Sequence, residues 1–281
     1  MIKVSILFNG LRGLKVLNYL KHKKDIKIKN IFLAKKFLNF DVYEKLKKKN
    51  IKFIVGNEHD LHCLLRENKN NIDVNIFSGF PYIVKNNLYN LSRFGSINLH
   101  AGKLPKYRGG SPLNWQIING EKKIGISVIK MSKEIDKGKI IKEHSFKLNE
   151  KDDIKKVHVK CNKIFPKITY QAIKKIIKKE KFLKQPKNYN KYFKQRTFKD
   201  GKIYWKKKNS AQIYNFVRAL TFPYHCAYTF FEKKIYFIPK CVKIKNSNNL
   251  VSPGNFFAKD RSIIVKTKEN CIKFYNPELY K

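Results

Sequence analysis

The stretch MIKVSILFNGLRGLKVLNYL, residues 1–20, decides the fold class of this chain. Residues 1–7 form a short apolar run that stops at Asn9 and Gly10, and residues 11–20 then carry apolar side chains at helical spacing. Further short apolar runs follow, separated in several places by lysine-rich helical patterns, at residues 29–33, 51–55, 74–77 and 96–99. Buried strands that alternate with helices predict an α/β fold with a mostly parallel sheet and helices on both of its faces.

The pattern of expected strands and helices changes after Gly120. Residues 124–131 and 139–148 alternate like strands, and a long helical pattern runs from Asp152 to about Lys181, with Pro166 inside it expected to kink or split the helix. Residues 210–220 form a second helical pattern. Short strand-like runs follow at 227–231, 235–238, 241–244, 263–266 and 271–274, with turns at Asn246, Asn248 and Pro253-Gly254. Such strands predict a small β-barrel or sandwich.

The polar, basic and aromatic stretch 183–208 separates these two parts of the chain. We therefore predict a first domain over residues 1–182, a linker over 183–208 and a β-rich accessory domain over 209–281.

Composition limits the classes of protein to consider. The chain has 281 residues, a formal charge of +43, 42% hydrophobic and 14% aromatic residues. That is too apolar for a disordered polycation. Only seven of the 63 basic residues are arginine, and the Lys- and Asn-rich profile is the one expected from an AT-rich genome. The basic surface should attract polyanions or phosphorylated ligands. Whether the lysine excess is functional or codon-bias drift stays open.

Several features predict where the protein resides and what it lacks. No run of about 18 uncharged apolar residues is present, so we expect no membrane span, and we expect no signal peptide. The five cysteines are odd in number, without a CxxC pair or zinc-ligand spacing. We therefore expect free thiols, a cytoplasmic location and no metal.

The densest chemical signal is SINLHAGKLPKYRGGSPLNWQIING, residues 96–120. Asn98 and His100 are two residues apart at the end of a predicted strand, so both should lie on one face, at a position where parallel sheets bind ligands. An Asn amide can donate to a developing oxyanion, and a His can move a proton near neutral pH. Asp136, in a later loop, could orient the His or accept the proton. Two such residues alone also fit an ordinary hydrogen-bonded loop.

Taken together, these motifs resemble those of the folate-dependent formyltransferases. That family contains glycinamide ribonucleotide formyltransferase, methionyl-tRNA formyltransferase and the sugar-nucleotide N-formyltransferases. The matching residues are, in order, Asn98-Leu-His100, Leu104-Pro105-x-Tyr107-Arg108-Gly109 and Ile135-Asp136-x-Gly138. The resemblance covers nearly the whole chain. It implies a Rossmann-like catalytic domain followed by an OB-like β-rich domain.

The resemblance also implies an activity and a set of site residues. The reaction would move a formyl group from N10-formyltetrahydrofolate to a primary amine without a metal, with Asn98, His100 and Asp136 as catalytic residues. The loop containing Gly79, Phe80 and Ile83 is similar to the segment that binds the pterin ring of the formyl donor. The acceptor would be bound by residues of the turn and the following helix, namely Arg108, Asn114 and Trp115.

The acceptor is the part that the resemblance leaves open. Methionyl-tRNA formyltransferases typically insert a basic, glycine-containing loop after the second strand, whereas residues 32–42 here lead directly into the next helix. We therefore favour the amino group of a nucleotide-linked amino sugar. Initiator methionyl-tRNA is the alternative, and a non-catalytic, basic nucleic-acid-binding relative is a second one. The oligomeric state is not fixed by the sequence, and a homodimer is one open alternative.

Overall fold

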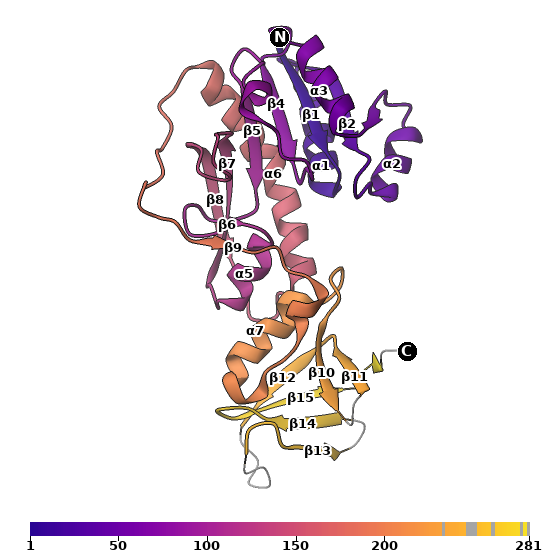
Figure 1. Ribbon diagram of the computed structural model, residues 1–281, viewed down its shortest axis with the longest axis vertical. Coiled ribbons are helices and arrows are strands. Elements are labelled where there is room, and N and C mark those ends of the chain that lie inside the picture. The colour runs from indigo at the N-terminus through magenta and orange to yellow at the C-terminus, as the bar shows by residue number, and fades with distance from the viewer. Residues whose placement is uncertain (232–233, 246–251, 260–261, 276–277, 280–281) are drawn as a thin grey trace. The chain divides into compact units, whose positions relative to one another are not determined.

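The computed structural model describes residues 1–231, 234–245, 252–259, 262–275 and 278–279, and they form two compact units. The first unit comprises Met1–Arg108, Gly125–Ser145 and Val159–Lys191. The second comprises Gly109–Ile124, Phe146–His158 and Tyr192–Lys281. The chain passes from one unit to the other several times, so segments far apart in the sequence contribute to each (Figure 1).

A seven-stranded sheet forms the framework of the first unit, with strand order β3-β2-β1-β4-β5-β7-β8. The pairs β2–β3, β1–β2, β1–β4 and β4–β5 are parallel, and β7 runs antiparallel to β5. The strands are β1 (Ile2–Phe8), β2 (Ile26–Ala34), β3 (Ile54–Gly56), β4 (Val74–Ser78), β5 (Ser96–His100), β7 (Lys123–Lys130) and β8 (Ile140–Lys147). The mostly parallel α/β sheet predicted from the apolar runs is confirmed.

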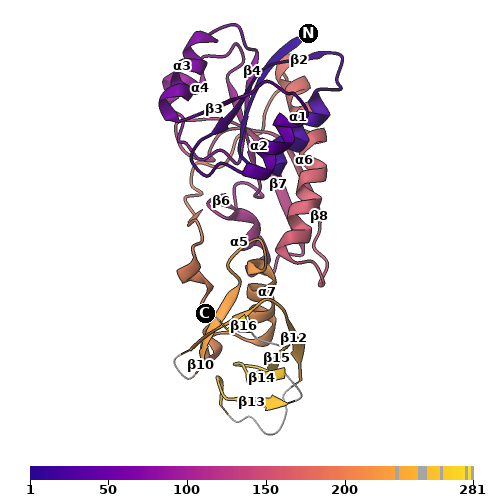
Figure 2. The same cartoon turned by 90° about the vertical axis from the view of Figure 1, so that its right-hand side faces the viewer.

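Helices cover both faces of this sheet because neighbouring strand residues point to opposite sides. Leu7 of β1 packs into a cluster with leucines of α3 (Glu58–Glu67) and α4 (Asn86–Tyr89). Phe8 lies under α1 (Leu11–Leu20), where a Cβ on Gly13 would be 2.2 Å from its ring. Figure 2 shows α3 and α4 on one side of the sheet and α1 on the other. The short helix α2 (Phe40–Lys47) follows β2.

The long helix α6 (Ile154–Ile177) corrects one expectation, because it continues through Pro166 as one element and is not split. The buried residues Cys161 and Phe165 before the proline, and Ile168 and Ala172 after it, keep both halves packed on the same apolar side. That packing outweighs the lost backbone hydrogen bond. Asp152 and Asp153 lie just before the helix, where the Asp153 carboxylate accepts a hydrogen bond from the Lys156 backbone N–H.

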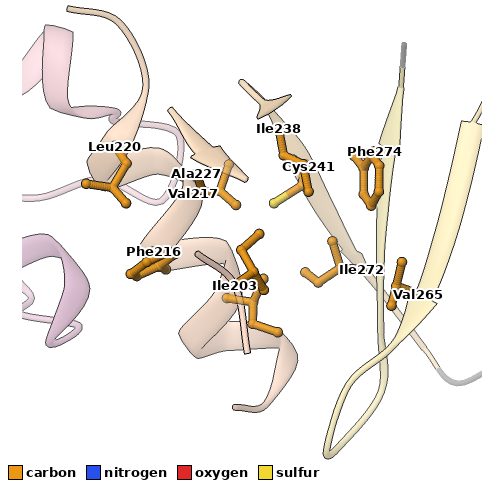
Figure 3. Packing of buried hydrophobic residues seen from close by; sticks show 11 residues of the cluster. Ile203, Phe216, Val217, Leu220, Ala227, Ile238, Cys241, Val265, Ile272 and Phe274 are labelled. Carbon is orange, nitrogen blue, oxygen red and sulfur yellow. The ribbon is translucent and has the colours of Figure 1, made fainter. Parts of the chain in front are cut away.

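The second unit is built around α7 (Ser210–Leu220) and two small antiparallel sheets with strand orders β10-β11-β16 and β12-β15-β14-β13. Figure 3 shows one buried apolar cluster to which Phe216, Val217 and Leu220 of the helix and Ile272 and Phe274 of β15 belong. The strands are β10 (Ala227–Phe231), β11 (Lys234–Ile238), β12 (Cys241–Ile244), β13 (Phe256–Lys259), β14 (Ser262–Lys266), β15 (Cys271–Tyr275) and β16 (Glu278–Leu279). The expected β-rich C-terminal part is confirmed.

The remaining elements are short. They are β6 (Arg108–Gly109), which pairs with β9 (Tyr192–Phe193), the helix α5 (Pro112–Ile118), and the 3-10 helices η1 (Phe198–Gly201) and η2 (Trp205–Lys207). The sequence analysis missed β13 and β16, and the turn expected at Asn246 and Asn248 lies outside the described residues. Of the helices that the structure describes, none combines the length and apolar character that crossing a bilayer requires.

Candidate active site

Strand β5 brings Asn98 and His100 to one face of the sheet, as their spacing predicts. The strand lies between β4 and β7, with Asn98 paired to Phe77 on one side and to Ile129 on the other. Both neighbours are buried, and Asn98 itself is half-buried. The central position of β5 therefore fixes the backbone under both polar side chains.

The His100 ring is held from both of its nitrogens. Its Nε2 lies 2.6 Å from the backbone carbonyl oxygen of Tyr107. Because a carbonyl only accepts hydrogen bonds, Nε2 carries a proton and donates it there. The other nitrogen, Nδ1, lies 3.4 Å from Oδ1 of Asp136. Both side chains are buried, with 6% and 7% of their surface exposed, so water screens this pair only weakly.

The close approach of His100 to the Tyr107 carbonyl depends on Gly102. A Cβ on residue 102 would lie 2.5 Å from both Nε2 of His100 and the Tyr107 oxygen. A side chain there would separate the two atoms. The glycine therefore leaves the space in which the ring nitrogen meets its acceptor.

Asp136 reaches His100 from the loop between β7 and β8. Its backbone adopts the left-handed conformation, with φ of 57°. That conformation is unfavourable for most side chains and is tolerated by aspartate more readily than by bulky residues. The loop then passes Gly138, where a Cβ would lie 1.7 Å from the Lys130 carbonyl oxygen. The loop thus returns the carboxylate to the β5 face within a few residues.

A cavity of about 230 Å³ opens beside these residues within the first unit. Asn98 and Asp136 belong to its wall, and so do Phe80 and Ile83 of the predicted donor-binding loop. The other lining residues are Phe77, Pro81, Tyr82, Val84 and Ile129 to Ile135. Gly79, the third residue predicted in that loop, precedes Phe80 with φ of 59°, in the left-handed region where glycine is favoured. The cavity therefore combines a mainly apolar wall with a few polar groups, as small-molecule sites do.

A larger depression of about 950 Å³ lies elsewhere in the first unit and contains none of the predicted catalytic residues. Its wall includes Lys130, Lys139 and three lysines after α6, together with Phe94 and Leu183. Burial lowers the pKa of the Lys130 ammonium. The smaller cavity is the candidate site, because Asn98 and Asp136, the carboxylate paired with His100, belong to its wall.

The three predicted acceptor-binding residues have protein partners. Arg108 is fully buried, and its guanidinium donates to the Gln185 side chain and to the Tyr189 carbonyl. Asn114, in the second unit, is buried and donates to the Ala219 carbonyl. Trp115, also in the second unit, donates from Nε1 to the Lys194 carbonyl at 3.0 Å. Their roles toward an acceptor stay predictions.

Sequence reasoning did not find two groups that hold the site. One is the backbone carbonyl of Tyr107, which accepts from His100, and the other is Gln185, whose amide contacts the Asp136 loop. A backbone carbonyl leaves no mark in the sequence. Gln185 lies in the stretch that we interpreted as a linker, where no local pattern distinguishes it from its polar neighbours.

Comparison with known proteins gives the family. The N-terminal formyl transferase profile matches residues 33–173, and the formyl transferase C-terminal domain profile matches residues 197–278. The chain is 34% identical over 237 residues to the bifunctional polymyxin resistance protein ArnA of Wigglesworthia glossinidia brevipalpis, over 79% of this chain and 34% of that protein. It is 33% identical over 205 residues to a methionyl-tRNA formyltransferase of Caldanaerobacter subterraneus subsp. tengcongensis, over 72% of this chain and 65% of that protein.

A solved structure shares the fold over nearly the full length. It is an N-formyltransferase from Helicobacter canadensis, determined with folinic acid and dTDP-3-aminofucose, with a TM-score of 0.72 and 21% identity over 99% of this chain and 100% of that one. The matches to the two curated relatives span about a third and just under two thirds of their lengths. The sequence profile that matches half of the chain, supported by this likeness of fold, shows that the chain belongs to the formyl transferase family.

Proposed function

We propose that the protein transfers a formyl group from N10-formyltetrahydrofolate to a primary amine. The observation that carries this proposal is the contact between His100 Nδ1 and Asp136 Oδ1 at 3.4 Å, beside a cavity whose wall includes Asn98. The three groups supply an amide donor, a histidine that can be protonated and a carboxylate. These are the groups that acyl transfer to an amine requires.

Each group has a distinct role in this reaction. The neutral amine attacks the formyl carbon, so that the carbon–nitrogen bond forms and negative charge develops on the formyl oxygen. The Asn98 amide donates to that oxygen and stabilises the charge, an effect of about 2.7–4 kcal/mol per donor in other enzymes. His100, whose two ring nitrogens face the Tyr107 carbonyl and Asp136, orients that carboxylate. Asp136 accepts the proton of the attacking amine, directly or through water. The bond from the formyl carbon to N10 then breaks, and the proton held by Asp136 passes to N10, directly or through water.

The cavity suits the formyl donor. Phe77 and Phe80 meet edge to face, with ring centroids 5.4 Å apart, and form part of an apolar wall. We propose that the flat, partly apolar pterin ring packs between this wall and the loop that carries Asp136. We propose that the loop of Gly79, Phe80 and Ile83 holds the donor. We also propose that residues 1–182 carry the reaction, because all of these residues belong to that range.

For the acceptor, we favour a nucleotide-linked amino sugar. The connection between β2 and α2 is short, because the strand ends at Ala34 and the helix begins at Phe40. Asn9 fixes this connection, donating from Nδ2 to the carbonyls of Ala34, Lys36 and Phe37. A compact, fixed connection supports a small acceptor. The ligand of the Helicobacter canadensis structure, dTDP-3-aminofucose, is of this class.

Methionyl-tRNA is the second candidate, and two observations favour it. The Caldanaerobacter relative is a methionyl-tRNA formyltransferase, and a formal charge of +43 suits a polyanionic partner. The third reading, a non-catalytic nucleic-acid-binding protein, gives no reason for the buried His100–Asp136 pair.

Salt dependence separates the two acceptors. We expect kcat/KM to be far higher with an amino-sugar nucleotide than with methionyl-tRNA, and to fall only gently with salt, because a diphosphate offers about two charges. An enzyme that acts on tRNA neutralises many phosphates. Each of them should steepen the fall of log kcat/KM with log salt concentration by about 0.7–0.9. Efficient formylation of methionyl-tRNA with a steep slope, and none of a panel of amino-sugar nucleotides, would reverse this choice. If neither acceptor is formylated, formyl transfer itself is in doubt.

A further inference from the structure

The loop that carries Asp136 is held by a side chain far along the chain. Nε2 of Gln185 donates to the carbonyl oxygen of Asp136 at 2.8 Å and to that of Gly138 at 2.7 Å. One amide group thus bridges two carbonyls of the same loop, on either side of Lys137. Because Asp136 has left-handed backbone dihedrals, the loop needs such external contacts to keep this conformation.

The orientation of that amide is fixed in turn by Arg108. Its Nε and Nη2 atoms lie 3.1 and 2.8 Å from Oε1 of Gln185, and its Nη1 donates to the Tyr189 carbonyl. A guanidinium only donates hydrogen bonds, so it selects the oxygen of the Gln185 amide and turns the NH₂ group toward the Asp136 loop. Arg108 is fully buried, and a buried planar guanidinium that donates to several acceptors has little freedom to move.

We propose that Arg108 and Gln185 are positioning residues that hold Asp136 against His100. The proposal rests on the proposed formyl transfer, in which Asp136 accepts a proton. Neither residue contacts the reacting atoms in this scheme. Gln185 acts through the loop backbone, and Arg108 acts through Gln185. Part of the stretch interpreted as a linker then has a role in catalysis, because it supplies the amide that sets the carboxylate.

Two substitutions at residue 185 separate the contacts. Gln185→Ala removes the amide. Gln185→Glu keeps an acceptor for Arg108 and nearly the same shape, but places a carboxylate oxygen against the two loop carbonyls. We expect both variants to lower kcat by about 10- to 100-fold, since a displacement of about 1 Å can cost that much. We expect KM for the amine to change less than threefold. Gln171→Ala, at a half-buried glutamine of α6, is the matched control and should keep wild-type kinetics.

Testing Gln185→Ala in the Asp136→Asn protein distinguishes a positioning role of Gln185 from a general loss of stability. In the Asp136→Asn protein, the carboxylate that Gln185 positions is already lost, so adding Gln185→Ala should lower kcat by less than threefold more. If Gln185 served only stability, the two losses would multiply. Losses that multiply, or a Gln185→Ala enzyme with wild-type kcat, would overturn the proposal.

Hydrogen exchange tests the contact without requiring activity. We expect amides of residues 132–138 to exchange at least tenfold faster in Gln185→Ala than in the wild-type and Gln171→Ala proteins, with little change elsewhere. Unchanged exchange in this segment would also overturn the proposal. If the wild-type enzyme forms no formylated product, the proposed function fails, and the exchange data still decide whether Gln185 holds the loop.

Discussion

The interior around His100 buries polar and charged side chains, whereas the interior around Phe274 buries almost only apolar ones. In the first unit, His100, Asp136 and Arg108 are buried polar groups, each with hydrogen-bond or charge partners. In the second unit, α7 and the strands enclose an almost wholly apolar cluster that includes Ile272 and Phe274 (Figure 3). Buried polar groups cost stability unless they are paired, whereas buried apolar groups contribute to it. The difference indicates that the first interior is arranged for chemistry and the second for stability.

This comparison gives distinct expectations for substitutions. Changes around His100 should alter the rate of the reaction more than the free energy of unfolding. Changes around Phe274 should alter the free energy of unfolding more than the rate of the reaction. A result in which either substitution acts mainly on the other quantity would break the comparison.

The largest effect is expected at the proposed catalytic pair, His100 and Asp136. His100→Ala and Asp136→Asn should each lower kcat/KM for formyl transfer by about 10²–10⁴-fold, the usual contribution of a general acid or base. Because the two residues act as a unit, the double variant should lose little beyond the worse single variant. Steady-state or single-turnover formation of the formylated amine measures the loss.

Thermal unfolding of the same variants is the control. The variants should stay folded under assay conditions, and their midpoints should fall less than that of Phe274→Ala. If both single variants keep most of the wild-type kcat, these residues are not the catalytic ones.

A smaller effect on rate, but a large one on stability, is expected in the second unit. Phe274 is 2% exposed and stacks on Trp205, with ring centroids 6.3 Å apart. Phe274→Ala should lower the free energy of unfolding by about 3–5 kcal/mol, as measured by urea titration. Phe256 is on the same sheet but 44% exposed, so Phe256→Ala should cost much less.

The Phe274→Ala protein also tests the proposal that residues 1–182 bind the formyl donor. Under conditions where it remains folded, its dissociation constant for the donor should match that of the wild-type protein. A large loss of donor affinity in a folded Phe274→Ala protein would show that the two interiors are not functionally separate.

The smallest effect concerns a surface carboxylate. Hydrogen bonds from Lys194 and from the Thr197 backbone hold the pKa of Asp200 at about 2, below its ordinary value of 3.8. The ionised form is therefore stabilised in the folded protein. Its contribution is present above about pH 4 and is lost as the pH falls toward 2. Asp200→Asn should lower stability at pH 6 by no more than about 1 kcal/mol, because the pair is close to solvent.

The measurement is the difference in unfolding midpoint between the wild-type and Asp200→Asn proteins as a function of pH. That difference should shrink below pH 4 and vanish only below about pH 2. A difference that grows on acidification would contradict the assignment of Asp200 as the group responsible.

Local patterns determined the elements of this protein. The apolar run before Asn9 and Gly10 and the helical spacing after them correspond to β1 and α1, because burial of one face acts on every residue of such a segment. The same reasoning placed Asn98 and His100 on one strand face, since strand side chains alternate. It left the residues of β13 unassigned, and it expected Pro166 to kink or split a helix that continues through this residue as one element.

Only the tertiary structure decided how the site is assembled. The contact of Asp136 with His100 and the bridge from Gln185 to the Asp136 loop join segments distant in sequence. The Tyr107 carbonyl that accepts a hydrogen bond from His100 is also placed only by the folded turn between them. Arg108 illustrates the difference. The family resemblance implied a role in binding the acceptor, which stays a prediction, and only the folded chain shows its guanidinium buried against Gln185 and Tyr189. Periodicity records which face of an element is buried. It does not record which distant hydrogen-bond acceptor will satisfy a buried charge, because that depends on how the loops close.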